Sequence, residues 1–339
     1  YRLHGLSMGT SWSAQLYAPS PPYCRALQTR IESRLLQINA QMSTWDADSL
    51  ISRINSADKG WYALPDDFYA VISAALALAE QTQGAFDPTL GELINLWGFG
   101  AAGPVYAPPR ADALRTALLR SGWRKTVLNR QHHALWQPGG LHFDFSSIAK
   151  GYAVDEMARV LDHAGIPDYL VELGGEMKAR GKAQATRPWR VDIEHPNAHT
   201  RSTRENTHNE QETENPESAF PIVLDNAALA TSGDYLRNFT SNHTRYSHTL
   251  DGRTGQPIAN QLAAVSVIHE STMQADALAT ALQCLGPLNG WAFAQENDLA
   301  ALFFIRRKDD YEVRFTPAFA RKAGAAPMRK TCTENKALS

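Results

Sequence analysis

Strand-like and helix-like segments follow one another along this chain without the strict alternation that a doubly wound parallel sheet requires. Apolar residues recur at helical spacing in residues 22–42, 66–84, 111–120, 149–164, 272–285 and 288–296. Runs typical of strands lie at 10–18, 169–173, 189–194, 220–224, 227–231, 245–250, 263–269, 299–305 and 311–315. Residues 138–140 (Pro-Gly-Gly) predict a hairpin between short strands that end at Phe143. This mixture favours an α+β fold.

Composition and charge narrow the class of protein. The chain has 339 residues, 43% of them hydrophobic, which is enough for one large domain or two fused lobes. The 33 basic and 35 acidic residues are not gathered into a dense basic stripe, which argues against a nucleic-acid partner. No apolar run approaches the length of a membrane span. The chain begins at Tyr1 rather than Met, so we expect either that a leader was removed or that the chain was trimmed, and a secretory signal or lipid anchor could precede it.

The cysteines and two polar segments add further expectations. Cys24, Cys284 and Cys332 are scattered, and without a C-x-x-C motif they indicate neither a zinc knuckle nor a disulfide framework. Cys284 lies on an apolar helical face and is expected to be a small core residue. Residues 197–218 contain Ala198 as their only hydrophobic residue and predict a long disordered surface insertion. The polar residues 320–339 predict a flexible C-terminal tail.

Three familiar motifs receive little support. Gly5, Ser7 and Gly9 match the nucleophile elbow G-x-S-x-G, but that elbow needs a strand before it and a helix after it. Only four residues precede this match, and a strand-like segment follows it. Neither G-x-G-x-x-G nor G-x-x-x-x-G-K-[ST] occurs, so dinucleotide-fold and P-loop interpretations have no support.

Two segments carry most of the functional signal. Residues 144–152 (Asp-Phe-Ser-Ser-Ile-Ala-Lys-Gly-Tyr) gather a carboxylate, two hydroxyls and a lysine at a predicted strand-to-helix corner. Asp276 and Thr280 stand four residues apart, on one face of a predicted helix. An isolated pair of this kind is usually just an exposed face. Here small and apolar residues surround it, and a carboxylate in such a helix needs a partner or a metal. Oxygen ligands at this spacing suit a hard cation such as Mg²⁺ holding a phosphate.

Three further features allow two interpretations each. Gly174 and Gly175, followed by Glu176, are either a glycine-rich turn or a close backbone approach to a ligand with a carboxylate aimed at it. His248 is either structural or a general base. Trp45 is either a core residue or a flat ring that covers a planar heterocycle.

Taken in order, these segments resemble the ApbE family of FAD:protein FMN transferases over about residues 5–305. The matching stretches are residues 7–10, 43–45, 48–55, 84–89, 96–100, 144–152, 174–176, 230–233 and 248–255, together with Asp276 and Thr280. Two features depart from the family pattern. Trp45 stands where many members carry Tyr, and the insertion at 197–218 lies outside the motif set.

The resemblance implies a T-fold-like α+β architecture, a single domain over residues 1–319 in two lobes with FAD in the cleft between them. It implies Mg²⁺ ligands from Ser147, through its backbone carbonyl, and from Asp276 and Thr280. It makes His248 the candidate base, with Asp276 as a second catalytic residue. The implied FAD contacts are Met8, Trp45, Phe86, Asp87, Pro88, Thr89, Asp144, Lys150, Gly174, Gly175, Glu176 and Leu250.

The resemblance also implies a reaction and a setting. The enzyme would transfer FMN from FAD to a threonine hydroxyl of a client protein and release AMP, with Mg²⁺ required. The clients would be flavin-carrying subunits of membrane electron-transfer complexes. The location would be periplasmic, with an inner-membrane lipid anchor before trimming. Two alternatives remain open: hydrolysis of FAD to FMN and AMP at the same site, and binding or storage of FAD without catalysis.

Overall fold

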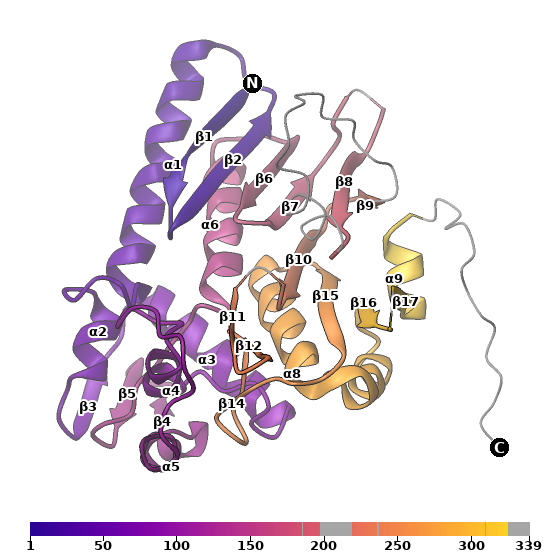
Figure 1. Cartoon of the computed structure of the whole chain (residues 1–339). Helices are drawn as coiled ribbons and strands as arrows, with labels where there is room; N and C mark the ends of the chain where they lie inside the picture. The colour runs from indigo at the N-terminus through magenta and orange to yellow at the C-terminus, as the bar shows by residue number, and fades with distance from the viewer. Residues whose placement is uncertain (185, 197–218, 236, 309, 325–339) are drawn as a thin grey trace, which may run out of the picture.

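An eight-stranded sheet forms the centre of the computed structural model, which describes residues 1–184, 186–196, 219–235, 237–308 and 310–324 (Figure 1). Every neighbouring pair of strands in this sheet is antiparallel. Its strands are, in sheet order, β1 (Arg2–Ser7), β2 (Thr10–Leu16), β6 (Tyr169–Leu173), β7 (Glu176–Arg180), β10 (Ala228–Gly233), β15 (Leu262–His269), β16 (Ala300–Arg306) and β17 (Tyr311–Phe315). The mixture of helices with an antiparallel sheet confirms the α+β prediction.

The two faces of this sheet are covered differently. Helices α1 (Pro21–Met42), α6 (Ala149–His163) and α8 (Thr272–Glu296) pack on one face. On the other face lie α9 (Pro317–Lys322) and a two-stranded sheet of β8 (Trp189–Glu194) and β9 (Ala219–Leu224). Side chains alternate between the two cores along a strand, so Phe303 belongs to the helix-side core and Phe304 to the opposite one.

Shorter elements gather beyond one end of the central sheet (Figure 1). The helices there are α2 (Leu50–Asn55), α3 (Asp66–Gln81), α4 (Gly91–Leu96), α5 (Ala111–Arg120) and a 3₁₀ turn, Trp123–Lys125. The strands are β3 (Gly60–Ala63), β4 (Val127–Asn129), β5 (Ala134–Gln137), β11 (Asn238–Ser241), β12 (Thr244–Ser247), β13 (Leu250–Asp251) and β14 (Gln256–Pro257). The prediction of two lobes with a ligand cleft between them, within one domain, stays a prediction.

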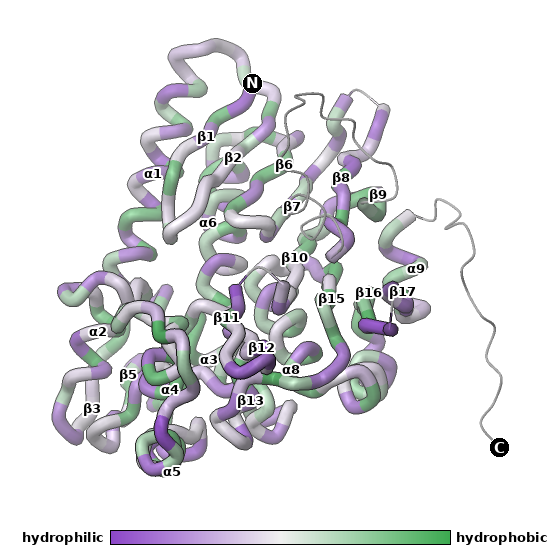
Figure 2. Tube along the Cα trace, viewed as in Figure 1, coloured by the Kyte–Doolittle hydropathy of each residue, from purple (hydrophilic) through white to green (hydrophobic). Residues whose placement is uncertain are grey.

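Residue pattern explains both long helices: hydrophobic spacing explains α1, and a glycine and a proline explain the break in α8. Apolar and hydrophilic residues alternate along α1 (Figure 2), and the buried residues recur at three- and four-residue intervals, from Leu27 through Ile31, Leu35 and Ile38. Helix α8 is interrupted at Gly286, whose φ of 79° and ψ of 179° are not helical, directly before a proline. The prediction of two consecutive helices, 272–285 and 288–296, is therefore confirmed. Cys284 is 4% exposed, as expected of a core residue.

Two sequence interpretations of local turns are settled by strand pairing. The hairpin predicted at residues 138–140 is wrong, because β5 pairs with β3 and β4, and His142 instead forms a bridge with Leu90. The residues that match the nucleophile elbow form the turn between β1 and β2, with Met8 at φ 51° and Gly9 at φ 74°. A strand follows this turn where an elbow requires a helix, so these residues do not form a nucleophile elbow.

The expected tail begins later than predicted. Helix α9 continues to Lys322, and Ala323 is buried against the sheet, so the prediction of a flexible tail is wrong for residues 320–323. Residues 325–339 and the insertion predicted at 197–218 lie outside the described residues. Among the residues that are described, no helix combines the length and apolar character needed to cross a bilayer.

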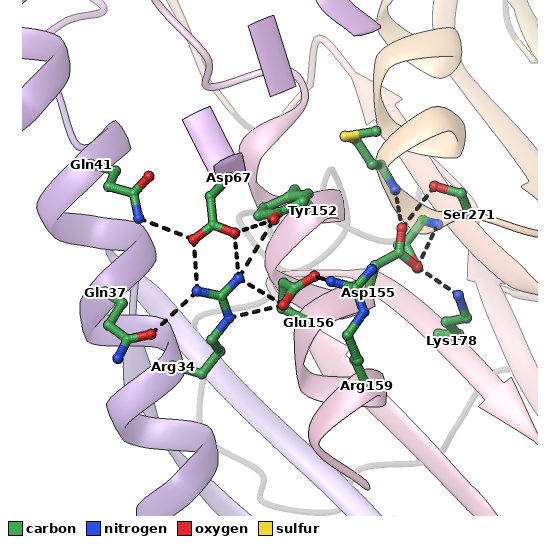
Figure 3. Close-up of polar contacts among 12 residues, drawn as sticks. Arg34, Gln37, Gln41, Asp67, Tyr152, Asp155, Glu156, Arg159, Lys178 and Ser271 are labelled. Carbon is green, nitrogen blue, oxygen red and sulfur yellow. Dashed lines mark hydrogen bonds and ion pairs between the residues drawn. The ribbon is translucent and has the colours of Figure 1, made fainter. Parts of the chain in front are cut away.

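Buried polar networks fasten α6 to its neighbours (Figure 3). On one side, the Arg34 guanidinium of α1 binds both carboxylate oxygens of Asp67 at 2.6 and 2.7 Å and Glu156 Oε2 at 2.8 Å. Tyr152 donates its hydroxyl to Asp67 at 2.6 Å. Because Glu156 is only 3% exposed, its charge needs ion pairs, and Arg159 on the same helix supplies a second one. The network holds α1, α3 and α6 together.

Candidate active site

Three elements of the helix-covered face meet at the candidate site. Lys150 and Gly151 lie in the first turn of α6, Glu176 begins β7, and Asp276 lies in the second turn of α8. Asp276 is 4% exposed, and its Oδ2 accepts a hydrogen bond of 2.9 Å from the Gly151 backbone N–H. The Lys150 ammonium forms an ion pair with Glu176 Oε1. The structure thus brings together three charged residues from the sequence predictions.

Burial dominates the electrostatics of this cluster. It raises the pKa of Glu176 to about 7, although Lys150 opposes the shift, and the charge of Asp276 adds to it. Burial also raises the pKa of Asp276 against the pull of Lys150. Burial disfavours the charged form of Lys150, but the two carboxylates outweigh it and raise the Lys150 pKa. Glu176 Oε2 is buried without a hydrogen-bond partner in the described structure. Two carboxylates facing one ammonium group make a site that favours an added cation.

The predicted metal ligands are oxygen atoms around the same junction. Thr280 lies one turn after Asp276 on α8, and its hydroxyl is 2.6 Å from Ser232 Oγ on β10. Ser147 is half-buried, just before the start of α6. Within the described ranges, no three His, Cys, Asp or Glu side chains form a metal-ligand group. The predicted set contains only one such side chain, so the magnesium site stays a prediction.

The corner before α6 is held by its own backbone and by the chain near Pro88. The Asp144 N–H donates to the Pro88 carbonyl at 2.9 Å. Asp144 Oδ1 accepts from the Ser146 N–H at 2.9 Å, which turns the chain towards α6. Asp144 is 8% exposed. Two segments that are predicted to contact FAD, residues 86–89 and the Asp144 corner, are therefore neighbours.

The loop at residues 86–89 is shaped by buried polar groups. Asp87 Oδ1 accepts from the Thr89 N–H at 2.8 Å and from the Thr89 hydroxyl at 2.6 Å, while Oδ2 accepts from the Trp123 N–H at 3.0 Å. Burial raises the pKa of Asp87 despite these hydrogen bonds. Phe86 is 3% exposed. These contacts give Asp87 and Thr89 a structural role in the loop, and their predicted role towards FAD is untested.

Two tight turns lie side by side at one end of the central sheet. The first contains Met8, and the second contains Gly174 and Gly175 between β6 and β7, with φ values of 60° and 102°. Both central residues of a two-residue hairpin of this type need positive φ, which glycine adopts readily. The Gly174 N–H donates to the Ser11 carbonyl at 3.1 Å, so the turns are adjacent. The glycines therefore form a tight turn, and Glu176 turns inward to Lys150, while a close approach of this turn to a ligand stays a prediction.

His248 follows β12 and is held as one tautomer. Its Nδ1 lies 3.0 Å from the Arg237 carbonyl oxygen, which can only accept, so Nδ1 carries the proton and Nε2 has a free lone pair. Burial lowers the pKa of His248 to about 4, so the ring is neutral at pH 7. The adjoining Leu250 carbonyl accepts a weak hydrogen bond from Cys284 Sγ at 3.4 Å. This segment therefore lies against α8, the helix of Asp276.

Trp45 lies in the loop between α1 and α2 and is 65% exposed, so the core interpretation of this residue is wrong. Near the end of α1, Asn39 Nδ2 donates to Ser7 Oγ at 2.9 Å. This bond joins the chain segment before Trp45 to the turn that contains Met8. The broad exposed ring of Trp45 is available to stack on a planar ligand.

Sequence reasoning missed several partners in the site. Ser232 belongs to a recognised motif, but nothing local indicates that its hydroxyl meets Thr280, 48 residues later. The Lys150–Glu176 pair joins residues 26 positions apart. The Arg237 carbonyl orients His248, and a backbone oxygen leaves no signal in sequence.

A separate hollow of about 790 Å³ lies between β2, β6 and β8. Its lining includes Tyr1, Tyr17, Trp189 and Arg190, and none of the predicted site residues. The candidate site is therefore defined by its polar cluster rather than by this hollow.

Comparisons with known proteins agree with the geometry. The model of the ApbE family matches residues 8–303. A protein of Vibrio cholerae named FAD:protein FMN transferase is 34% identical over 319 residues, which cover 94% of this chain and 91% of the relative. The protein of the same name from Escherichia coli K12 is 29% identical, covering 94% and 87%.

Solved structures give the same result. The apo crystal structure of the Pseudomonas stutzeri flavinyl transferase ApbE superposes with a TM-score of 0.84 at 35% identity, covering 96% of this chain and 97% of the other. The flavin transferase ApbE from Vibrio cholerae has a TM-score of 0.83 at 32% identity, covering 95% and 98%. The chain belongs to the ApbE family.

Proposed function

We propose that this protein is an FAD:protein FMN transferase that requires Mg²⁺ and modifies a threonine hydroxyl. Relatives that match it almost from end to end carry the name of this activity. The observation that carries the proposal is the buried Asp276 carboxylate, beside the Lys150–Glu176 pair and one turn before Thr280. A charge buried in an apolar helix needs a compensating ligand, and a cation supplies it.

The Mg²⁺ ion would be held by Asp276, the Thr280 hydroxyl and the Ser147 backbone carbonyl. The residues fit this ion because all three donors are oxygens and because few carboxylates are needed when phosphate and water complete the shell. The register of α6 against α8 supports the set. Gly151 contacts Asp276, Ser147 lies just before the start of α6, and Thr280 lies one turn after Asp276 on α8. When bound, Mg²⁺ would neutralise negative charge on the pyrophosphate of FAD.

His248 would act as the general base. The client threonine oxygen attacks the phosphorus on the FMN side of the FAD pyrophosphate, and a new O–P bond forms. The bond from that phosphorus to the bridging oxygen breaks, and the bridging oxygen leaves with AMP. The threonine proton passes to Nε2 of His248, the nitrogen left free by the bond to the Arg237 carbonyl. The negative pyrophosphate would raise the pKa of His248 when FAD binds and strengthen it as a base.

FAD would lie along the two turns and the loops that adjoin this cluster. Trp45 and Met8 would contact the flavin side, and Lys150 would meet the phosphates. The remaining contacts would come from residues 86–89, Asp144, residues 174–176 and Leu250, in a cleft between two lobes.

The clients would be flavin-carrying subunits of membrane electron-transfer complexes. The reaction would take place in the periplasm.

The direct test combines the protein with FAD, Mg²⁺ and a client that bears the acceptor threonine. The expected product is a fluorescent client band that survives denaturation, with one AMP released per FMN attached. A client with Thr→Val at the acceptor is the matched control and should remain unlabelled. AMP released at the same rate without any client would identify an FAD hydrolase instead. Tight FAD binding without AMP under any condition would identify a binding protein.

Replacing the base tests the mechanism. We expect His248→Ala to lower the transfer rate by about a hundredfold to ten-thousandfold while the affinity for FAD changes little. His132→Ala, in an exposed turn, is the control and should leave both unchanged. Equal losses of FAD binding and of transfer in His248→Ala would reassign His248 to positioning the ligand.

A further inference from the structure

Asp155 lies on α6, one turn beyond Gly151, and its carboxylate accepts hydrogen bonds from two other elements (Figure 3). Its Oδ1 accepts from Lys178 Nζ of β7 at 2.7 Å. At the start of α8, Oδ1 accepts from the Thr272 N–H and hydroxyl, both at 3.0 Å. Oδ2 accepts from the Ser271 hydroxyl at 2.7 Å and from the Met273 N–H at 3.0 Å. One side chain therefore joins α6, β7 and the N-terminus of α8.

The contacts of Asp155 form one layer, and the contacts of the active-site cluster form a second layer one helical turn away. Along α6, the step from Asp155 back to Gly151 is one helical turn. Along α8, the step from Thr272 forward to Asp276 is also one turn. Asp155 binds Thr272, and Gly151 binds Asp276, so the two helices run antiparallel and are joined at two successive turns. A slide at the first contact must displace the second.

Strand β7 is likewise joined to α6 at two positions. Glu176 and Lys178 are two residues apart on β7 and so point to the same face of the sheet. Glu176 pairs with Lys150, and Lys178 pairs with Asp155. Each layer thus contains one ion pair between α6 and β7 and one contact between α6 and α8.

The helices approach too closely at this point to tolerate a shift. A Cβ atom added at Gly151 would lie 2.3 Å from the Thr272 carbonyl oxygen and 2.8 Å from Asp276 Cβ. The backbones of α6 and α8 are therefore in direct contact, and the hydrogen bonds of Asp155 join the two helices one turn away. Burial opposes ionisation of Asp155, but Lys178 and the N–H groups of α8 outweigh it and hold its pKa below the usual range. The carboxylate is charged at neutral pH and favours the positive end of α8.

We propose that Asp155 is a positioning residue of the metal site, which keeps Asp276 and Thr280 in register with the start of α6 by binding the N-terminus of α8. The inference rests on the proposed function because it assumes that Mg²⁺ binds at Asp276. Metal and catalytic groups must be held within about 0.5 Å of their working geometry by the residues behind them. A loss of outer contacts of this kind typically weakens metal affinity about tenfold to a hundredfold.

The test is Asp155→Asn in the full chain, compared with Asp162→Asn. Asparagine keeps the shape of aspartate, but its amide NH₂ would face donors from Lys178 or from α8. Asp162 is the matched control because it lies on the same helix and also pairs with β7, through Arg180, but accepts nothing from α8. The measurements are the melting temperature and the Kd of Mg²⁺ by titration calorimetry, with FAD present.

We expect at least tenfold weaker Mg²⁺ binding in Asp155→Asn and less than twofold change in Asp162→Asn. If Asp155→Asn does not fold, Lys178→Met removes the ion pair and leaves the bonds to α8, and we expect at least threefold weaker Mg²⁺ binding. A lower melting temperature with unchanged Mg²⁺ affinity in the folded variant would overturn the inference and leave Asp155 a purely structural role. Absence of Mg²⁺ binding in the unsubstituted protein would instead overturn the proposed function.

Discussion

Removing the Asp276 carboxylate should separate stability from metal binding. In Asp276→Ala, the Gly151 N–H loses its partner, which costs about 1 kcal/mol. The same change removes a carboxylate whose charged form is disfavoured by burial, as its raised pKa shows, and this relief offsets the cost. The two effects nearly cancel, so we expect the melting temperature to stay within about 4 °C of the original.

The contribution of Asp276 to folding stability should change with pH in one direction. The folded-state pKa of Asp276 lies above its ordinary value of 3.8, so between these two values the folded state holds a proton that the unfolded state has lost. Stability from this group is present below pH 3.8 and is lost as pH rises through the folded-state pKa. The melting temperature of Asp276→Ala, relative to the unsubstituted protein, should therefore be higher at pH 8 than at pH 4. Differential scanning calorimetry at both values measures this difference.

Unlike the melting temperature, the transferase activity should fall strongly in Asp276→Ala. Without Asp276, the proposed site keeps only neutral oxygen donors, and we expect transfer of FMN to fall more than tenfold at any practical Mg²⁺ concentration. Tenfold corresponds to about 1.4 kcal/mol of barrier. The assay counts AMP and labelled client under Mg²⁺ titration. The control is Asp298→Ala, an exposed carboxylate just beyond the end of α8. A folded Asp276→Ala protein that keeps more than about a tenth of the activity would refute the reasoning.

Three further experiments, one titration and two substitutions, test other parts of the structure. The ring signals of His248 should titrate near pH 4 by NMR in the absence of FAD, because burial lowers its pKa, and a midpoint at 6.5 or above would contradict this. Gly151→Ala should lower stability by about 1–3 kcal/mol in a urea titration and weaken Mg²⁺ binding, since the new Cβ would meet the Thr272 carbonyl at 2.3 Å. Arg34→Ala should cost about 1–3 kcal/mol in the same titration, because Asp67 and the buried Glu156 each lose a charged hydrogen-bond donor while Arg159 still pairs with Glu156, and a loss under 0.5 kcal/mol would contradict this.

Local periodicity was sufficient for many elements. Helix α1 could be predicted because each turn repeats the same apolar face, and the break in α8 because Gly286 and Pro287 both disfavour a continuous helix. The spacing of Asp276 and Thr280 also follows from one helical turn. In these cases the deciding interactions lie within four residues of each other, so the order of amino acids alone contains them.

Tertiary structure decided which distant groups meet. The hairpin expected at residues 138–140 failed because pairing of β5 with β3 depends on where the whole strand packs, not on the turn that follows it. The ion pair of Lys150 with Glu176, and the carboxylate of Asp155 at the start of α8, join residues far apart in sequence. Such partners are set by burial, because a charge removed from water takes whichever counter-charge the fold places beside it. The sequence by itself therefore indicated the chemical groups of the site, and the packing of α6 against β7 and α8 decided their arrangement.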